Sequence, residues 1–148
     1  MISGCNAPLG MENGLISDAQ ISASSEWDNN HGADRARLNG RRINLKGGAW
    51  CSRYNTIGQW LQVDLETYAT VTGLATQGRS AYDQWVTKYR MQYSNDGVNF
   101  HWYREQTVRS VKVQCKQINK SIIKSDFSGR TTTKWILVYF PIPNEIVP

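Results

Sequence analysis

The sequence predicts an all-β domain, either a sandwich or a barrel, from three observations. Hydrophobic residues alternate with polar ones at a period of two, which is typical of half-buried strands. The apolar segments are short and are separated by loops rich in Gly, Asn, Asp and Ser. The chain of 148 residues is 40% hydrophobic and holds 6 Trp and 7 Tyr, enough large side chains for one core. We find no repeat or linker, so residues 1–148 are expected to form a single domain.

The first expected strands are residues 21–24, 59–65 and 71–76. In residues 59–65 the apolar Leu61, Val63 and Leu65 share one face, and polar residues occupy the other. This segment is therefore predicted to pack one face against the core.

A hairpin is expected between residues 88–94 and 98–103. Gly97 ends an Asn-Asp-Gly turn, and glycine readily takes the positive φ that tight hairpin turns require. The side chains expected in the core of this hairpin are Tyr89, Met91, Tyr93, Phe100 and Trp102.

The last expected strands are residues 108–113 and 135–140. Residues 135–140 are continuously apolar, which is typical of a strand buried on both faces. The pattern thus predicts strands along the whole chain.

Charge and cysteine content limit the classes of partner and site. The net charge of +5 favours anionic partners such as acidic phospholipid, sulfated glycan or nucleic acid, or only solubility, since the basic residues are dispersed. Cys5, Cys51 and Cys115 are an odd number and form no Cys-x-x-Cys pair, so no zinc site is expected. A sequon at Asn119 fits secretion, although no signal peptide opens the chain, which suggests a trimmed domain or a fragment.

Several segments together resemble one known family. In chain order they are CNAPLGMENG (5–14), ISASS (21–25), ARLN (36–39), GAW (48–50), QWLQVDL (59–65), TQGR (76–79), WVTKY (85–89) and YSNDG (93–97). This series is similar to discoidin domains, also called coagulation factor V/VIII (F5/8) type C domains, and the resemblance is strongest over residues 5–106.

The resemblance implies a jelly-roll-like antiparallel β-sandwich with ligand loops at one end. It also implies a secreted or cell-surface recognition module for cell adhesion, which binds glycans, phospholipid head groups, collagen or other proteins. The family closes with a strand whose cysteine pairs with the one at the start, whereas this sequence departs from the pattern over residues 116–134 and ends at Pro148. A truncated product without ligand binding is therefore an alternative.

The first two candidate loops are residues 26–34 and 42–51. Trp27 is expected to present a flat apolar face to a ligand, the alternative being that it packs back on its loop. Leu45 and Lys46 form an apolar tip with a cation, Gly47 and Gly48 suggest a tight turn, and Trp50 is expected in the core. The polar candidates of the first loop are Asp28, Asn29 and Asn30.

The third candidate loop is residues 78–85. The guanidinium of Arg79 suits a carboxylate, phosphate or sulfate, the alternative being a structural salt bridge with Asp83 or another nearby carboxylate. Tyr82 is a second aromatic anchor, and Asp83 is a further candidate ligand contact. Trp85 is expected to begin a core strand. By resemblance to collagen-binding discoidin receptors, Trp27 and Arg79 are ligand contacts, but Gly47 stands where those receptors carry an acidic residue.

We expect a glycan or an extracellular protein such as collagen as the ligand. A peripheral binder of anionic phospholipid, using Leu45 and Trp27 with Lys46, Arg42 and Arg53, is the alternative. No catalysis is expected, because the chain has 2 His and neither a nucleophile elbow nor a phosphate loop. No nucleic-acid partner and no cofactor are expected either. A structural calcium ion near the loops is left open, although no dense acidic cluster requires it.

Overall fold

The computed structural model describes residues 7–80, 82, 84–86, 89–103 and 122–140. Two short 3-10 helices are present in this part of the chain, η1 (Asp18–Gln20) and η2 (Ala33–Arg35). The strands are β1 (Ile21–Ala23), β2 (Gln59–Gln77), β3 (Arg90–Ser94), β4 (His101–Trp102) and β5 (Ile122–Phe140). All described pairs are antiparallel, in the order β1-β2-β5-β3-β4, which confirms the predicted all-β class.

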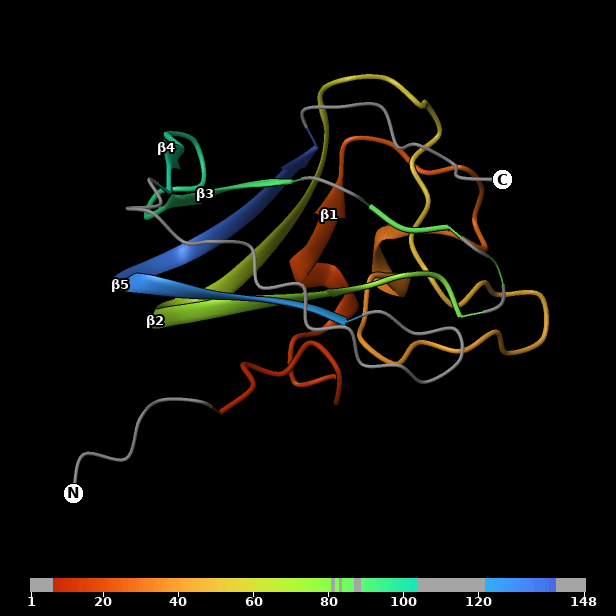
Figure 1. The fold of residues 1–148 in the computed structure, drawn as a ribbon, viewed down its shortest axis with the longest axis horizontal. Helices are drawn as coiled ribbons and strands as arrows, with labels where there is room; N and C mark the ends of the chain where they lie inside the picture. The colour runs from red at the N-terminus through yellow and green to blue at the C-terminus, as the bar shows by residue number, and fades with distance from the viewer. Residues whose placement is uncertain (1–6, 81, 83, 87–88, 104–121, 141–148) are drawn as a thin grey trace.

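The two long strands fold over to make the layers of a sandwich. The pairing of β2 with β5 is interrupted between Asp64 and Ala69, and Glu66 has a φ of 58° within this interruption. Figure 1 shows both strands bending there, at the left of the view. Each strand therefore has one segment in the first layer and one in the second. A β-bulge increases local bend and twist, which accounts for a single strand serving two layers.

The core lies in two clusters that β2 connects. One is formed by Val71, Met91, Ile136 and Val138, and the other by Ile16, Ile21, Ala33 and Val63. Leu61 and Leu65 pack against both clusters, so the predicted inward face of residues 59–65 is confirmed.

Strand β5 confirms the prediction made from its continuous apolar run. Three consecutive residues, Ile136, Leu137 and Val138, are buried. Because neighbouring residues of a strand point to opposite faces, this part of β5 is covered on both sides.

The expected strand over residues 98–103 is only partly present. β4 holds His101 and Trp102, and Trp102 is 44% exposed, so its assignment to the core is wrong. Trp102 pairs with Gln92, whereas the neighbouring Met91 and Tyr93 contact the core cluster. Since directly paired residues share a face, this register turns Trp102 outward, where its ring meets Tyr139 edge-on.

Trp85 is the second correction. It lies outside the strands of the described chain and is 41% exposed, so it does not begin a core strand. The strand expected at residues 108–113 falls outside the described residues.

The turn after β3 forms as predicted and is fixed by Asp96. Its carboxylate accepts hydrogen bonds from the backbone N–H groups of Val98 (2.9 Å) and Asn99 (2.8 Å) and from the Asn99 side chain (2.7 Å). These bonds, led by the one from the Asn99 side chain, hold the pKa of Asp96 far below its ordinary value. Gly97 has a φ of 73°, as this turn requires.

Replacing Gly97 by alanine is expected to lower the free energy of unfolding by about 2–3 kcal/mol. The substitution adds strain at positive φ and places a methyl group 2.9 Å from Cε2 of Trp135. Gly14→Ala is the matched control, because Gly14 has a φ of 80° with nothing within 4 Å of the added carbon. Urea denaturation of both variants should show the larger loss for Gly97→Ala; equal losses would mean that contact with Trp135 is unimportant.

Candidate ligand-binding loops

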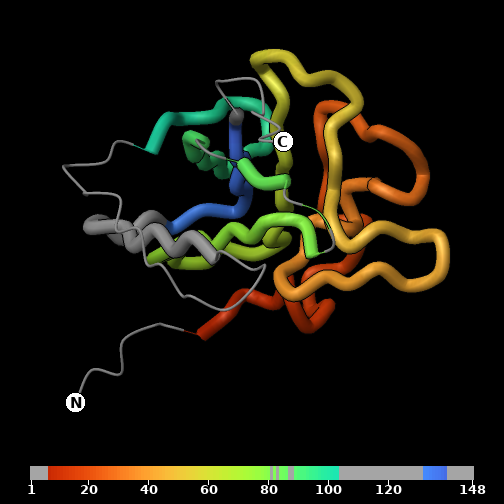
Figure 2. The backbone as a smooth tube through the Cα atoms, turned by 45° about the vertical axis from the view of Figure 1, so that its right-hand side comes forward, coloured from red at the N-terminus to blue at the C-terminus, as the bar shows by residue number. Residues whose placement is uncertain are grey.

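The structure brings the first and second predicted loops side by side. The backbone N–H of Trp27 donates to the carbonyl of Cys51 (2.9 Å), and the N–H of Cys51 donates to the carbonyl of His31 (3.2 Å). A further bond runs from the N–H of Gly47 to the carbonyl of Asn30 (2.7 Å). These loops lie on the right in Figures 1 and 2, away from the bend of β2 and β5.

Gly47 allows this close approach. A Cβ atom at Gly47 would lie 2.5 Å from Cδ2 and 2.6 Å from Nε2 of His31, closer than real side chains come. The tight turn expected at Gly47 and Gly48 lies instead between Ile43 and Lys46, whose backbones exchange two hydrogen bonds of 3.1 and 3.0 Å. Asn44, with a φ of 54°, takes the left-handed conformation in that turn. Glycine at residue 47 is thus needed for contact between loops rather than for a turn.

Arg79 joins the third loop to the first. Its Nη2 lies 2.9 Å from Nε2 of His31, and its Nη1 donates to Oε1 of Gln84 (2.9 Å). The guanidinium carbon lies 4.1 Å from the centre of the Tyr82 ring, a close cation–π contact. Asp83, predicted as a ligand contact and as an alternative salt-bridge partner of Arg79, lies outside the described residues.

His31 is the central residue of the cluster, and the sequence did not single it out as a site residue. Its Nδ1 lies 2.7 Å from Oδ1 of Asp28, which also accepts the backbone N–H of Asn30 (2.9 Å). The bond with His31 is the largest cause of a lowered pKa of Asp28. A histidine three residues after an aspartate in a polar loop is the only sequence signal that could have suggested this pair.

The predicted apolar anchors are exposed on these loops. Trp27 is 64% exposed and Leu45 is 76% exposed, and Tyr82 is also exposed, as is Asn29. The Nζ atom of Lys46 lies 3.8 Å from the carboxylate Oδ2 of Asp34. Trp50 is half-buried against the core, and its Nε1 donates to the carbonyl of Ser25 (3.0 Å), as expected of a structural residue.

A buried polar network fixes the base of the loops. Gln59 is buried, and its Oε1 accepts the hydroxyl groups of Ser24 (2.9 Å) and Ser25 (2.5 Å). The Ser25 hydroxyl oxygen also accepts the backbone N–H of Arg53 (3.1 Å). Because buried polar groups are costly to leave unpaired, this network holds the segments that lead into and out of the loops.

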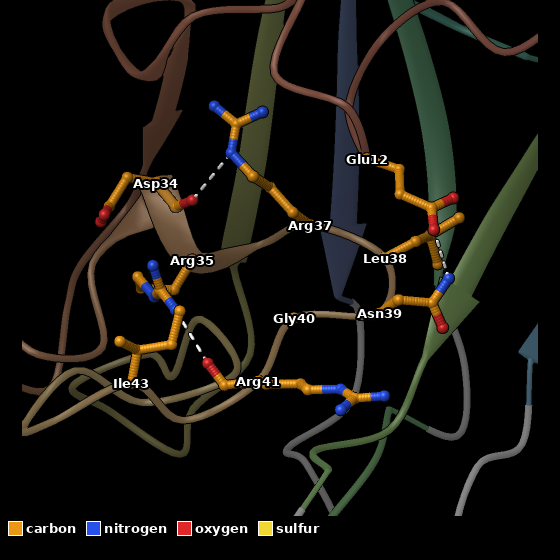
Figure 3. A pocket seen from close by; sticks show the side chains of 9 residues that line it. All are labelled: Glu12, Asp34, Arg35, Arg37, Leu38, Asn39, Gly40, Arg41 and Ile43. Carbon is orange, nitrogen blue, oxygen red and sulfur yellow. Dashed lines mark hydrogen bonds between the residues drawn. The ribbon is translucent and has the colours of Figure 1, made fainter.

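A surface hollow of about 320 Å³ lies beside the second loop (Figure 3). Arg35 lines it, but its Nε donates to the carbonyl of Gly47 (2.7 Å) and its Nη2 to that of Arg41 (3.1 Å). Arg37 is likewise bonded to the carbonyls of Asp34, Met11 and Ile16. Both guanidinium groups therefore bind backbone carbonyl groups of the protein.

Two further features concern metal and thiol chemistry. Within the described residues no three His, Cys, Asp or Glu side chains are grouped to hold a metal ion, so the calcium alternative stays a prediction. Cys51 carries a free thiol whose pKa is raised by burial. Cys5 and Cys115 lie outside the described residues.

No helix of the described chain is long and apolar enough to cross a bilayer.

Comparison with known sequences gives a consistent assignment. The family model for the F5/8 type C domain matches residues 20–145. Retinoschisin of Mus musculus is 41% identical over 106 residues, which cover 68% of this chain and 46% of that protein. Coagulation factor V of Sus scrofa is 40% identical over 154 aligned positions, covering 99% of this chain and 7% of that protein. The chain thus spans less than half the length of these relatives.

Solved structures show the same fold at low sequence identity. Discoidin II of Dictyostelium discoideum matches with a TM-score of 0.70 and 21% identity, over 85% of this chain and 49% of that one. The family 32 carbohydrate-binding module of C. perfringens NanJ, in complex with galactose, matches with a TM-score of 0.56 and 20% identity, over 88% of both chains. Both likenesses support the β-sandwich.

Proposed function

Because the chain belongs to the F5/8 type C domain family, we propose that it is an extracellular recognition module whose three loops bind a glycan. The observation that carries the proposal is the combination of exposed aromatic rings with a fixed guanidinium. Trp27 and Tyr82 offer flat apolar faces for the C–H groups of a sugar ring. Arg79 is held by His31 and Gln84, and its guanidinium has further N–H groups of the kind that donate hydrogen bonds to sugar hydroxyl or carboxylate oxygens.

The polar residues of the first loop fit the same role. Asp28 and Asn29 are exposed beside Trp27, and carboxylate and amide groups bond sugar hydroxyls well. Site geometry carries the argument, while the galactose complex of the NanJ module supports it only by analogy of fold. An extracellular protein such as collagen would use the same Trp27 and Arg79.

A second candidate is an anionic membrane surface. Ile43 and Leu45 are exposed on the turn of the second loop, and Arg42 and Lys46 are exposed next to them. Apolar tips flanked by cations suit insertion among acidic head groups. We rank this candidate second because the first loop is polar and Lys46 is placed beside Asp34.

A glycan array with purified protein tests the proposal. We expect saturable binding that weakens about tenfold or more in Trp27→Ala and in Arg79→Ala, since aromatic and arginine anchors carry most of such binding energy. Trp102→Ala and Arg90→Ala are matched controls, because both residues are exposed and lie on strands β4 and β3 rather than on the three loops. These controls should bind as the unmodified chain does.

The opposite results are equally informative. A folded sample could bind no glycan on the array and yet bind vesicles that contain phosphatidylserine. That result would contradict the glycan proposal and favour the membrane candidate. Equal losses in Trp27→Ala and Trp102→Ala would place the ligand away from the three loops.

A further inference from the structure

The contacts of His31 fix which of its nitrogens carries the proton. The Asp28 carboxylate is ionised and can only accept a hydrogen bond, so Nδ1 of His31, 2.7 Å away, must be the donor. In neutral imidazole Nε2 then has a lone pair. The guanidinium of Arg79 has only donors, so Nη2 donates to this lone pair across 2.9 Å. Neutral His31 satisfies both partners.

The neighbours of the imidazole favour this one ring orientation. The backbone of Gly47 lies against Cδ2 and Nε2, so close that not even a methyl group would fit between them. A ring flip would also remove the Nδ1 contact with Asp28. The acceptor role of Nε2 toward Arg79 is therefore set by the contact of Nδ1 with Asp28, while Gly47 limits the space around the ring.

Protonation of His31 turns its attractive contact with Arg79 into a repulsive one. Nε2 would then carry a hydrogen facing another N–H donor, and two cationic groups would meet across the 2.9 Å between Nε2 and Nη2. The contact with Asp28 would persist as an ion pair. Acidification therefore favours separation of Arg79 from His31, and with it separation of the third loop from the first.

We infer that His31 is a pH-dependent positioning residue, which holds Arg79 in the ligand site when neutral and releases it when protonated. The inference rests on the proposed function of the three loops. It predicts binding at neutral pH and release at mildly acidic pH. Imidazole is the side chain whose ordinary titration falls between about pH 5 and 8.

Other ionisable groups lie near His31 on all three loops. Asp28 and Arg79 contact its two ring nitrogens, and Cys51 contacts its backbone. Tyr82 packs against Arg79, and Glu26 accepts the N–H of Ala33, two residues after His31. Asp28 has a lowered pKa and remains ionised, while Cys51 has a raised pKa and remains a neutral thiol. The hydrogen bond from Arg79 thus exists while His31 is neutral and is lost when Nε2 takes up a proton.

The first test measures the positioning itself by NMR, without ligand. We expect a hydrogen on Nδ1 of His31 and a bare Nε2 at pH 7.5, and an Arg79 side-chain signal that moves as His31 titrates toward pH 5. The chain has 2 His, so His101→Gln is a matched control that leaves the Arg79 shift unchanged. A hydrogen on Nε2 at pH 7.5, or an Arg79 signal that ignores the titration, would overturn the inference.

The second test uses a galactose-coated sensor surface. The unmodified chain and His101→Gln should bind about tenfold more weakly at pH 5.0 than at pH 7.5, as expected for losing one contact of a charged donor. His31→Gln should bind almost equally at both values, because its amide can donate to Asp28 and accept from Arg79 without titrating. A tenfold change that persists in His31→Gln would overturn the inference. Absence of binding at both values would count against the proposed function, and the NMR result alone would then decide the role of His31.

Discussion

Replacing Ile136 by alanine is expected to lower the free energy of unfolding by about 3 kcal/mol, the usual cost of emptying this volume in a core. Ile136 is buried on β5 and packs with Val71, Met91 and Val138, which come from β2, β3 and β5. Its removal leaves a cavity at the point where these strands meet. A cavity between strands that cannot move together without losing their hydrogen bonds is filled only partly by relaxation.

Urea denaturation, monitored by tryptophan fluorescence, measures this loss of unfolding free energy. Ile57→Ala is the matched control, because Ile57 is 63% exposed and loses the same atoms without leaving a cavity. Its expected change is within about 0.5 kcal/mol. Equal losses in the two variants would contradict the placement of Ile136 in the core.

The period-two pattern correctly predicted the buried parts of the central strands β2 and β5. Leu61, Val63 and Leu65 on β2 and the apolar run of β5 are strands whose burial follows from their own sequence. In a central strand the buried face and the hydrophobic face must coincide, since any other register would expose the apolar side chains. Local sequence was therefore sufficient for these elements.

The same reasoning failed for Trp102 and Trp85. Trp102 lies on β4, whose only described neighbour is β3, and its direction is set by pairing with Gln92. An edge strand is less constrained by burial, so an aromatic residue there satisfies the pattern on either face. Which face is used depends on the register with another strand, which a single sequence does not reveal.

The candidate site was predicted as separate loops but not as a connected cluster. The exposure of Trp27 and Tyr82 follows from their polar surroundings in the sequence. The contact of His31 with Arg79 joins residues 48 positions apart, and the missing Cβ of Gly47 matters only because His31 lies against it. Such contacts depend on how loops pack in space, so glycine in the second loop suggested a turn instead.

Replacing Gly47 by alanine is expected to weaken glycan binding about a hundredfold and to lower the free energy of unfolding by about 2 kcal/mol. The added methyl group would lie 2.5 Å from the His31 ring and 3.2 Å from the carbonyl oxygen of Asn30. Either the ring leaves its place, which breaks the bonds to Asp28 and Arg79, or the second loop withdraws. The loss should exceed that of Arg79→Ala because several contacts between the loops break together.

A double-mutant cycle separates this cause from general strain. His31→Ala removes the ring, so Gly47→Ala should cost much less stability in that background than in the unmodified chain. Binding would stay weak, since Arg79 has still lost its partner. Equal costs in both backgrounds would mean that the methyl group acts on the backbone of Asn30 alone. The site would then depend on Gly47 for the path of the loop, and His31 would not be the residue for which glycine is required.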